Sequence, residues 1–294
     1  MHKSIESLIR DAEQSGRPLP EVVLASESAE SGVPAADIRA RIARTLGVMR
    51  GAIEEGLKGE ARSASGLTGG RARKLWESGP RLLGAPVTET LARAIATLEV
   101  NAAMGLIVAA PTAGAAGVLP AVLVSMDEFQ HLGEEKLTDA MLVAGGVGGV
   151  IAQRASLAGA EGGCQAETGT AAAMGSAAVA WLCGGSHAQI STAIALTLQG
   201  MLGLICDPIG GLVEIPCIYR NASAAMQAIA GAEMALAGLD FPVSADEVID
   251  VMGEVGRRMP AAYRETAMGG LAATASARRL VQIRPSSRPS GFSR

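Results

Sequence analysis

Three of the four cysteines in this 294-residue chain lie in segments rich in glycine or proline. Cys164 follows two adjacent glycines, and Cys206 and Cys217 enclose the segment 206–217, which contains two prolines and another pair of glycines. Because thiolates bind zinc and iron–sulfur clusters, these three residues are candidate metal ligands. Cys183 follows an apolar run, and we expect it to pack in the core.

The spacing of these thiols leaves two interpretations open. Ten residues separate Cys206 from Cys217, which is not a known interval between metal ligands, so a plain interhelix connection with two buried thiols is the simpler interpretation. Structural zinc and electron-transfer clusters normally have all their protein ligands supplied. A four-iron cluster held by three cysteines would instead keep one iron open, as a Lewis acid that binds a substrate hydroxyl and helps hydroxide to leave.

A second candidate site is the run of small residues 110–117, in which Thr112 precedes Ala113 and Gly114. Successive backbone N–H groups in such a run can bind an anion, for example a carboxylate. Tight packing of alanine and glycine between helices explains the same run equally well. The segment 65–70 is a similar but weaker signal, and neither run matches a Walker loop or a dinucleotide-binding fingerprint.

Other common catalytic arrangements find little support in the sequence. The three histidines, His2, His131 and His187, fit surface or capping positions better than a Ser–His–acid triad. The few lysines lie outside any glycine-rich phosphate-binding cup, which argues against a pyridoxal-type site.

Composition argues against nucleic-acid binding and against a membrane span. With 25 basic and 29 acidic residues and 2% aromatic residues, the chain has no basic excess and few rings on which bases could stack. The stretches 100–126 and 168–206 carry no formal charge, but glycine and proline interrupt the first and polar side chains occupy the second. The lack of a secretory leader favours a reducing, cytoplasmic location.

Helical periodicity dominates the chain, and no strand-like alternation recurs. Helices are predicted from Pro34, from Pro86, over 134–158, over 187–204 and after Ser244, and the segment 58–85 is predicted to be a loop with one short helix. Ser244 and Glu247 form a capping-box pattern. The sequence therefore predicts an all-α fold, with a single, largely buried-helix catalytic domain over residues 1–283 and a flexible polar tail over 284–294.

Several strings of the sequence match one known family in the family's own order, over about residues 1–275. They are the segments 66–70, 99–105, 111–114, 162–167, 201–204, 206–217, 220–222, 264–266 and 269–272. On these strings the chain resembles the α subunits of the bacterial iron–sulfur L-serine dehydratases, and the two motifs that contain Cys164 and Cys206 are the most specific.

The resemblance implies an all-helical catalytic domain and a [4Fe–4S] cluster on Cys164, Cys206 and Cys217. L-serine would bind with its hydroxyl on the open iron and would be deaminated to pyruvate and ammonia by β-elimination. The substrate-binding residues implied by position are Thr68, Gly69, Asn101, Thr112, Ala113, Gly114 and Asn221, with the substrate carboxylate near Thr112 to Gly114.

The catalytic base is left open by the resemblance. Lys74 matches a lysine of the family and is a candidate, although its role could be structural. In this family the β subunit, or the fused N-terminal domain of single-chain members, carries a Ser-His-Thr motif that could supply the base instead.

The resemblance also implies a heteromer with a β subunit. This chain contains no regulatory β domain, so we expect it to be one half of a two-subunit enzyme, and its tail has no terminal cysteine that could inhibit the site. Two alternatives remain. One is an L-cysteine desulfidase-like lyase that uses the same cluster, and the other is a non-catalytic scaffold or membrane-associated subunit with buried thiols.

Overall fold

The computed structural model describes residues 2–282, which form helices joined by short connections. The α-helices are α1 (Ile5–Ser15), α2 (Leu19–Ser31), α3 (Ala35–Leu57), α4 (Arg71–Ser78), α5 (Ala85–Ala102), α6 (Val118–Gln130), α7 (Glu134–Arg154), α8 (Gly159–Gly162), α9 (Thr170–Leu182), α10 (His187–Gln199), α11 (Cys217–Leu236), α12 (Ala245–Arg258) and α13 (Ala275–Gln282). Short 3-10 turns are η1 (Ala113–Ala115), η3 (Ile209–Gly211), η4 (Ala261–Tyr263) and η5 (Gly270–Ala273), and η2 (Gln165–Gly169) is a π-helical turn. Within the described range no residue belongs to a β-strand, and the predicted all-α fold is confirmed.

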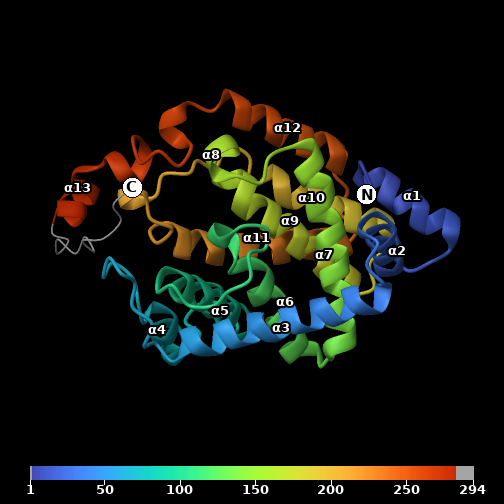
Figure 1. Ribbon diagram of the computed structural model, residues 1–294, viewed down its shortest axis with the longest axis horizontal. Helices are drawn as coiled ribbons and strands as arrows, with labels where there is room; N and C mark the ends of the chain where they lie inside the picture. The colour runs from blue at the N-terminus through green and yellow to red at the C-terminus, as the bar shows by residue number, and fades with distance from the viewer. Residues whose placement is uncertain (1, 283–294) are drawn as a thin grey trace.

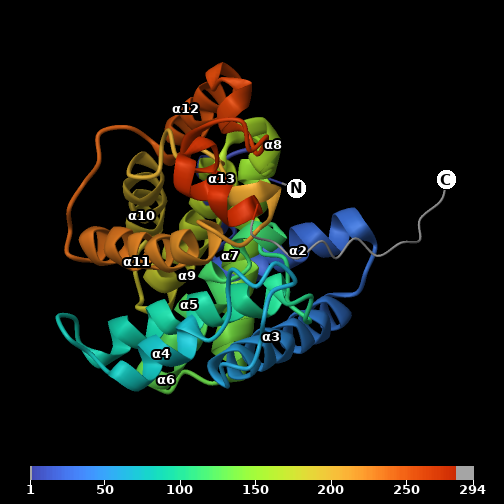
Figure 2. The ribbon, with the colours of Figure 1, turned by 90° about the vertical axis from the view of Figure 1, so that its left-hand side faces the viewer.

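Helix α9 lies at the centre of the molecule, between α6, α7, α10 and α11 (Figures 1 and 2). Every residue of α9 is buried except Trp181. Small side chains make this arrangement possible, because alanine and glycine let helix backbones approach closely. At Gly231 of α11 an added Cβ would lie 2.0 Å from the Thr197 hydroxyl of α10. The expectation of largely buried helices is therefore confirmed for the central part of the fold.

The predicted helix starts agree with the structure better than the predicted helix ends do. Helix α3 begins after Pro34, and α12 begins after Ser244, whose hydroxyl accepts a hydrogen bond from the Glu247 N–H as the capping-box pattern predicts. Helices α7 and α10 end before the predicted residues 158 and 204. Ala155 adopts extended backbone after α7, and a turn follows Gly200 after α10.

None of the described helices combines the length and the apolar character that crossing a membrane would require. The predicted polar tail, 284–294, lies outside the described residues, and the predicted domain boundary at residue 283 stays a prediction.

Close packing of α3 against α5 gives a first test of the fold. A Cβ added at Gly56 would lie 2.3 Å from the carbonyl oxygen of Ala96. We expect Gly56→Ala to lower the free energy of unfolding by about 1 to 3 kcal/mol, because the two helices must move apart. Gly51 in the same helix faces open space, so Gly51→Ala should raise this free energy by up to about 1 kcal/mol through helix propensity. Urea unfolding followed by far-ultraviolet circular dichroism measures both, and equal effects would contradict the close contact.

Candidate active site

The three cysteines singled out from the sequence come together in the structure. Cys164 lies just before the π-turn η2, Cys206 precedes η3, and Cys217 is the first residue of α11. Their residues are 4%, 4% and 9% exposed, and the three thiols are close enough to act on one another electrostatically. The fold thus brings Cys164, from the segment before α9, together with Cys206 and Cys217, from the connection between α10 and α11, although the spacing alone could not assign them to one site.

Cys183 lies apart from this group. It follows the last residue of α9, is exposed, and its sulfur is 3.6 Å from Nε2 of Gln130. The expectation that it packs in the core is therefore wrong. The apolar run before it belongs to the buried helix, but the chain turns towards solvent at Gly184, which adopts a positive φ.

Burial keeps all three clustered thiols protonated in the absence of a bound cation. Desolvation raises the pKa of Cys164, of Cys206 and of Cys217, the last to about 12. The negative charges of neighbouring thiolates and of Glu167 raise the pKa of Cys206 and Cys217 further, whereas the Arg220 guanidinium lowers that of Cys164 and Cys217.

The backbone of Cys206 is held by the segment that follows α12. The Cys206 N–H donates to the carbonyl oxygen of Tyr263 at 2.8 Å, and the Glu265 N–H donates to the carbonyl oxygen of Cys206 at 2.8 Å. These bonds form an isolated parallel bridge between Cys206 and Arg264. Glu265 adopts φ 62°, a conformation that costs free energy for a residue other than glycine, so the surrounding contacts must stabilise it.

A buried ion pair joins the Cys206 segment to helix α11. Asp207, 1% exposed, lies 2.8 Å from Nη2 of Arg220, whose Nη1 donates to the carbonyl oxygen of Ile205 at 2.8 Å. The Asp207 carboxylate also accepts a hydrogen bond from the Leu271 N–H at 2.6 Å. The residues on both sides of Cys206 are therefore fixed to α11, and Asp207 is also fixed to η5 through Leu271.

Asn221 positions the small-residue segment beside the thiols. Its Nδ2 donates to the carbonyl oxygens of Gly114 at 2.7 Å and Cys217 at 2.9 Å, and its Oδ1 accepts from the Gly117 N–H at 3.0 Å. Asn221 is fully buried, and these bonds use both of its amide hydrogens. It therefore fixes the 112–117 segment against the first turn of α11.

Glu167 has the most central position in the site, although the sequence analysis gave it no role. Its Oε1 accepts a hydrogen bond from the Thr112 hydroxyl at 2.7 Å, and its Oε2 is 4.0 Å from the sulfur of Cys206. Burial raises the pKa of its carboxyl group above the usual range. One sequence signal pointed to it: between Glu161 and Asp207, Glu167 is the single formally charged residue.

The glycine-rich loop 66–70 is attached to the same region. The Ser65 hydroxyl donates to Oε2 of Glu214, which lies between Cys206 and Cys217, at 2.5 Å. Thr68 is 2% exposed, and its hydroxyl has no hydrogen-bond partner among the described residues. Gly69 must be glycine, because it has φ 144° and an added Cβ would lie 2.5 Å from the carbonyl oxygen of Ala61.

The N-terminus of α4 follows this loop and is capped from α5. The carboxylate of Glu99, 1% exposed, accepts hydrogen bonds from the N–H groups of Arg71 at 3.0 Å and Ala72 at 3.2 Å. Asn101, two residues after Glu99 in the same helix, donates from Nδ2 to the carbonyl oxygen of Ala113 at 3.3 Å. Lys74 lies exposed on α4, and no described residue forms an ion pair or side-chain hydrogen bond with it.

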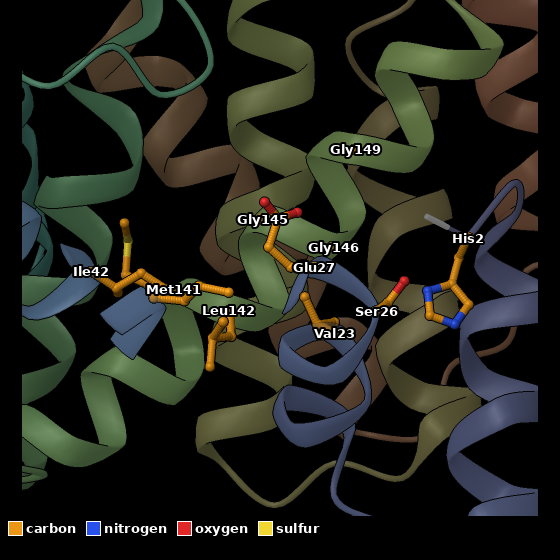
Figure 3. A pocket seen from close by; sticks show the side chains of 11 residues that line it. His2, Val23, Ser26, Glu27, Ile42, Met141, Leu142, Gly145, Gly146 and Gly149 are labelled. Carbon is orange, nitrogen blue, oxygen red and sulfur yellow. The ribbon is translucent and has the colours of Figure 1, made fainter. Parts of the chain in front are cut away.

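A separate cavity of about 330 Å³ lies away from these residues, between α2, α3 and α7 (Figure 3). Its walls are mainly apolar, and His2 of the N-terminal segment lies at one end. Its lining residues are His2, Val23, Ser26, Glu27, Ile38, Ile42, Met141, Leu142, Gly145, Gly146 and Gly149, and none of them belongs to the predicted site. The thiol cluster is a better candidate for the active site than this cavity, because several titratable groups lie together there.

The differing exposure of the four cysteines predicts how fast each thiol of the folded chain reacts with an alkylating agent. At mildly alkaline pH we expect iodoacetamide to alkylate Cys183 at least about tenfold faster than Cys164, Cys206 or Cys217, because burial and raised thiol pKa values suppress the reactive thiolate. Mass spectrometry of tryptic peptides over time measures the four rates. In denaturant the rates should become similar, and equally fast alkylation in the folded chain would contradict the burial.

Comparison with known proteins agrees with the motifs. The sequence matches the family described as "Serine dehydratase alpha chain" over residues 14–272. It is 44% identical over 283 residues to the "Probable L-serine dehydratase, alpha chain" of Bacillus subtilis, covering 95% of this chain and 94% of that protein. It is 38% identical to the "L-serine dehydratase, alpha chain" of Peptoniphilus asaccharolyticus, covering 95% and 97%. Against "L-serine dehydratase 2" of Escherichia coli the identity is 38%, covering 92% of this chain but 61% of that protein. The resemblance seen in the motifs is thus confirmed, and the chain belongs to the serine dehydratase alpha chain family.

Proposed function

We propose that this chain is the catalytic α subunit of an L-serine ammonia-lyase, which deaminates L-serine to pyruvate and ammonia with the help of a [4Fe–4S] cluster. One observation carries the proposal: Cys164, Cys206 and Cys217 are buried together beside the Thr112–Gly114 segment, in a chain that belongs to the serine dehydratase alpha chain family. Two relatives that it matches over nearly their full length have names that include "L-serine dehydratase, alpha chain".

The cysteine site fits such a cluster, because its donor atoms are cysteine sulfurs and small residues surround them. Iron–sulfur clusters are held by cysteine thiolates, and the site offers three. Space beside them depends on glycine, since a Cβ at Gly159 would lie 3.2 Å from the sulfur of Cys206. No described cation balances the charge of all three thiolates, and an iron core would supply that positive charge. Among the described residues no group of three or more His, Cys, Asp or Glu side chains is arranged to hold a single metal ion, so the cluster stays a proposal.

When bound, the cluster would supply a Lewis acid that polarises the substrate hydroxyl and assists its departure. The residues of this chain would then hold the rest of the substrate. In this proposal the N–H groups of Ala113 and Gly114 bind the carboxylate beside Thr112, whose hydroxyl stays bonded to Glu167. Asn221 and Asn101 keep this segment in place through the bonds described above. Thr68 and Gly69 would close the site from the loop that Ser65 attaches to Glu214.

The proton steps need a base at the α-carbon. Removal of the α-proton and departure of the hydroxyl group, which together amount to one water, give 2-aminoacrylate, which tautomerises to an imine and takes up water to release pyruvate and ammonia. Lys74 is this chain's candidate base, and a group from the β subunit is the alternative. Because Lys74 is exposed on α4, a partner chain that covered this helix would change the surroundings of its amino group.

Residues 1–283 would form one catalytic domain that works in the cytoplasm together with a β subunit. The comparisons support a heteromer: the chain covers 94% and 97% of two relatives named as alpha chains, but 61% of a longer relative named without a chain designation.

Loss of a cysteine tests the ligand set. In the chain co-expressed anaerobically with its partner, we expect about four irons and a brown colour, and we expect Cys206→Ser and Cys217→Ser to abolish both iron content and pyruvate formation. Cys183→Ser is the matched control and should change neither, because Cys183 is exposed and remote from the other thiols.

Iron and sulfide analysis, with pyruvate release from L-serine and from L-cysteine, measures these outcomes. Cys164→Ser with undiminished iron and activity would remove Cys164 from the ligand set. A colourless wild type would contradict the cluster, and faster pyruvate release from L-cysteine than from L-serine would replace the proposed substrate.

A further inference from the structure

Glu167 carries a carboxylate whose charge no described cation balances. It forms no ion pair with any described residue, and its single side-chain donor within normal hydrogen-bond distance is the Thr112 hydroxyl. The charged side chain that acts on it is Glu265, which is also acidic and raises the pKa of the Glu167 carboxyl group. A partly buried carboxylate in this situation is unfavourable unless a cation or a donor reaches it.

The carboxylate can be reached from the site. Within the run 162–170, Glu167 is the one residue that is not buried. Its oxygens lie between Thr112 on one side and Cys206 on the other, and glycine leaves space around them. An added Cβ would lie 3.0 Å from Oε1 at Gly114 and 2.5 Å from Oε2 at Gly159.

Two other acidic side chains around the thiols already have partners. Asp207 pairs with Arg220, and Glu214 accepts a hydrogen bond from Ser65 while 4% exposed. Glu167 therefore differs from Asp207 in having no described cation, and from Glu214 and Glu265 in its hydrogen bond to Thr112, which belongs to the segment that would hold the substrate.

We propose that Glu167 binds the α-ammonium group of the amino-acid substrate. This inference rests on the proposed function, since an amino acid brings one ammonium group and one carboxylate into the site. Oε2 of Glu167 accepts from the ammonium group, while Oε1 keeps the Thr112 hydroxyl. The Thr112–Gly114 segment then holds the substrate carboxylate on the other side of the α-carbon. Glu167 thereby selects amino acids over hydroxy acids that lack the ammonium group.

Glu167→Gln tests this role with little change of shape. The glutamine carbonyl oxygen still accepts from the Thr112 hydroxyl, so the variant removes mainly the charge. In the anaerobic holoenzyme with its partner chain, we expect the KM for L-serine to rise about 10- to 100-fold with a much smaller change in kcat, because a charge-assisted hydrogen bond to the ground state is lost.

A matched pair of ligands gives a second readout. 3-Hydroxypropionate is L-serine with the ammonium group replaced by hydrogen, and its inhibition constant against L-serine is compared with the KM. The wild type should prefer L-serine strongly, and Glu167→Gln should reduce this preference by a factor similar to its rise in KM. Glu161→Gln is the control: Glu161 is an exposed neighbour bonded to Ser156, and its loss should leave both values unchanged.

The outcomes separate this inference from the proposed function. An active wild type whose Glu167→Gln variant keeps its KM, or keeps its full preference for L-serine, overturns the role of Glu167 alone. A fall in kcat without a rise in KM also overturns it, since that result places Glu167 in proton transfer. A wild type that forms no pyruvate from L-serine overturns the proposed function itself. Should Glu167→Gln not fold, Glu167→Asp keeps the charge, and loss of the ammonium preference in that variant contradicts the inference.

Discussion

The buried ion pair between Asp207 and Arg220 holds together the two segments that supply Cys206 and Cys217. Asp207 directly follows Cys206, and Arg220 lies within the first turn of the helix that begins at Cys217. Their charged atoms are 2.8 Å apart, and the two side chains are 1% and 17% exposed. Removing either partner would leave a buried charge without compensation, which is costly. The relative position of two thiols therefore depends on one pair of charges.

Because this ion pair uses the positive charge of Arg220, the rest of the site stays electronegative. Among residues 2–282, Arg220 is the cation that lowers the pKa of Cys164 and of Cys217, and it is itself paired with Asp207. Glu167 and Glu265 add further negative charge beside Cys206. Such a site favours whatever brings positive charge with it. A cationic iron core at the thiols and an ammonium group at Glu167 would both meet that requirement, and they would do so at different atoms.

Local sequence signals predicted the elements and singled out the three cysteines that the structure brings together, but they did not predict the contacts between distant segments. Pro34 and Ser244 marked the starts of α3 and α12 because capping depends on neighbours in sequence. Asn221 and Glu167 could not be assigned in this way. Asn221 bonds to residues 104 and 107 positions earlier, and Glu167 to one 55 positions away, so their roles arise only when the helices pack. Cys183 was misjudged because the apolar residues before it end with the helix.

The π-turn η2 explains how one helix can be both buried core and part of the site. Gln165–Gly169 leads directly into α9, which is buried on nearly every side. A π-turn holds one more residue than an α-turn, so it shifts the faces of the helix locally. At this shift the Thr168 hydroxyl bonds back to the carbonyl oxygen of Cys164 at 2.9 Å, and Glu167 alone among residues 162–170 escapes burial. A regular helix would continue the buried face of α9 through this position, whereas the wider turn lets a carboxylate reach Thr112 and Cys206 from the edge of the core.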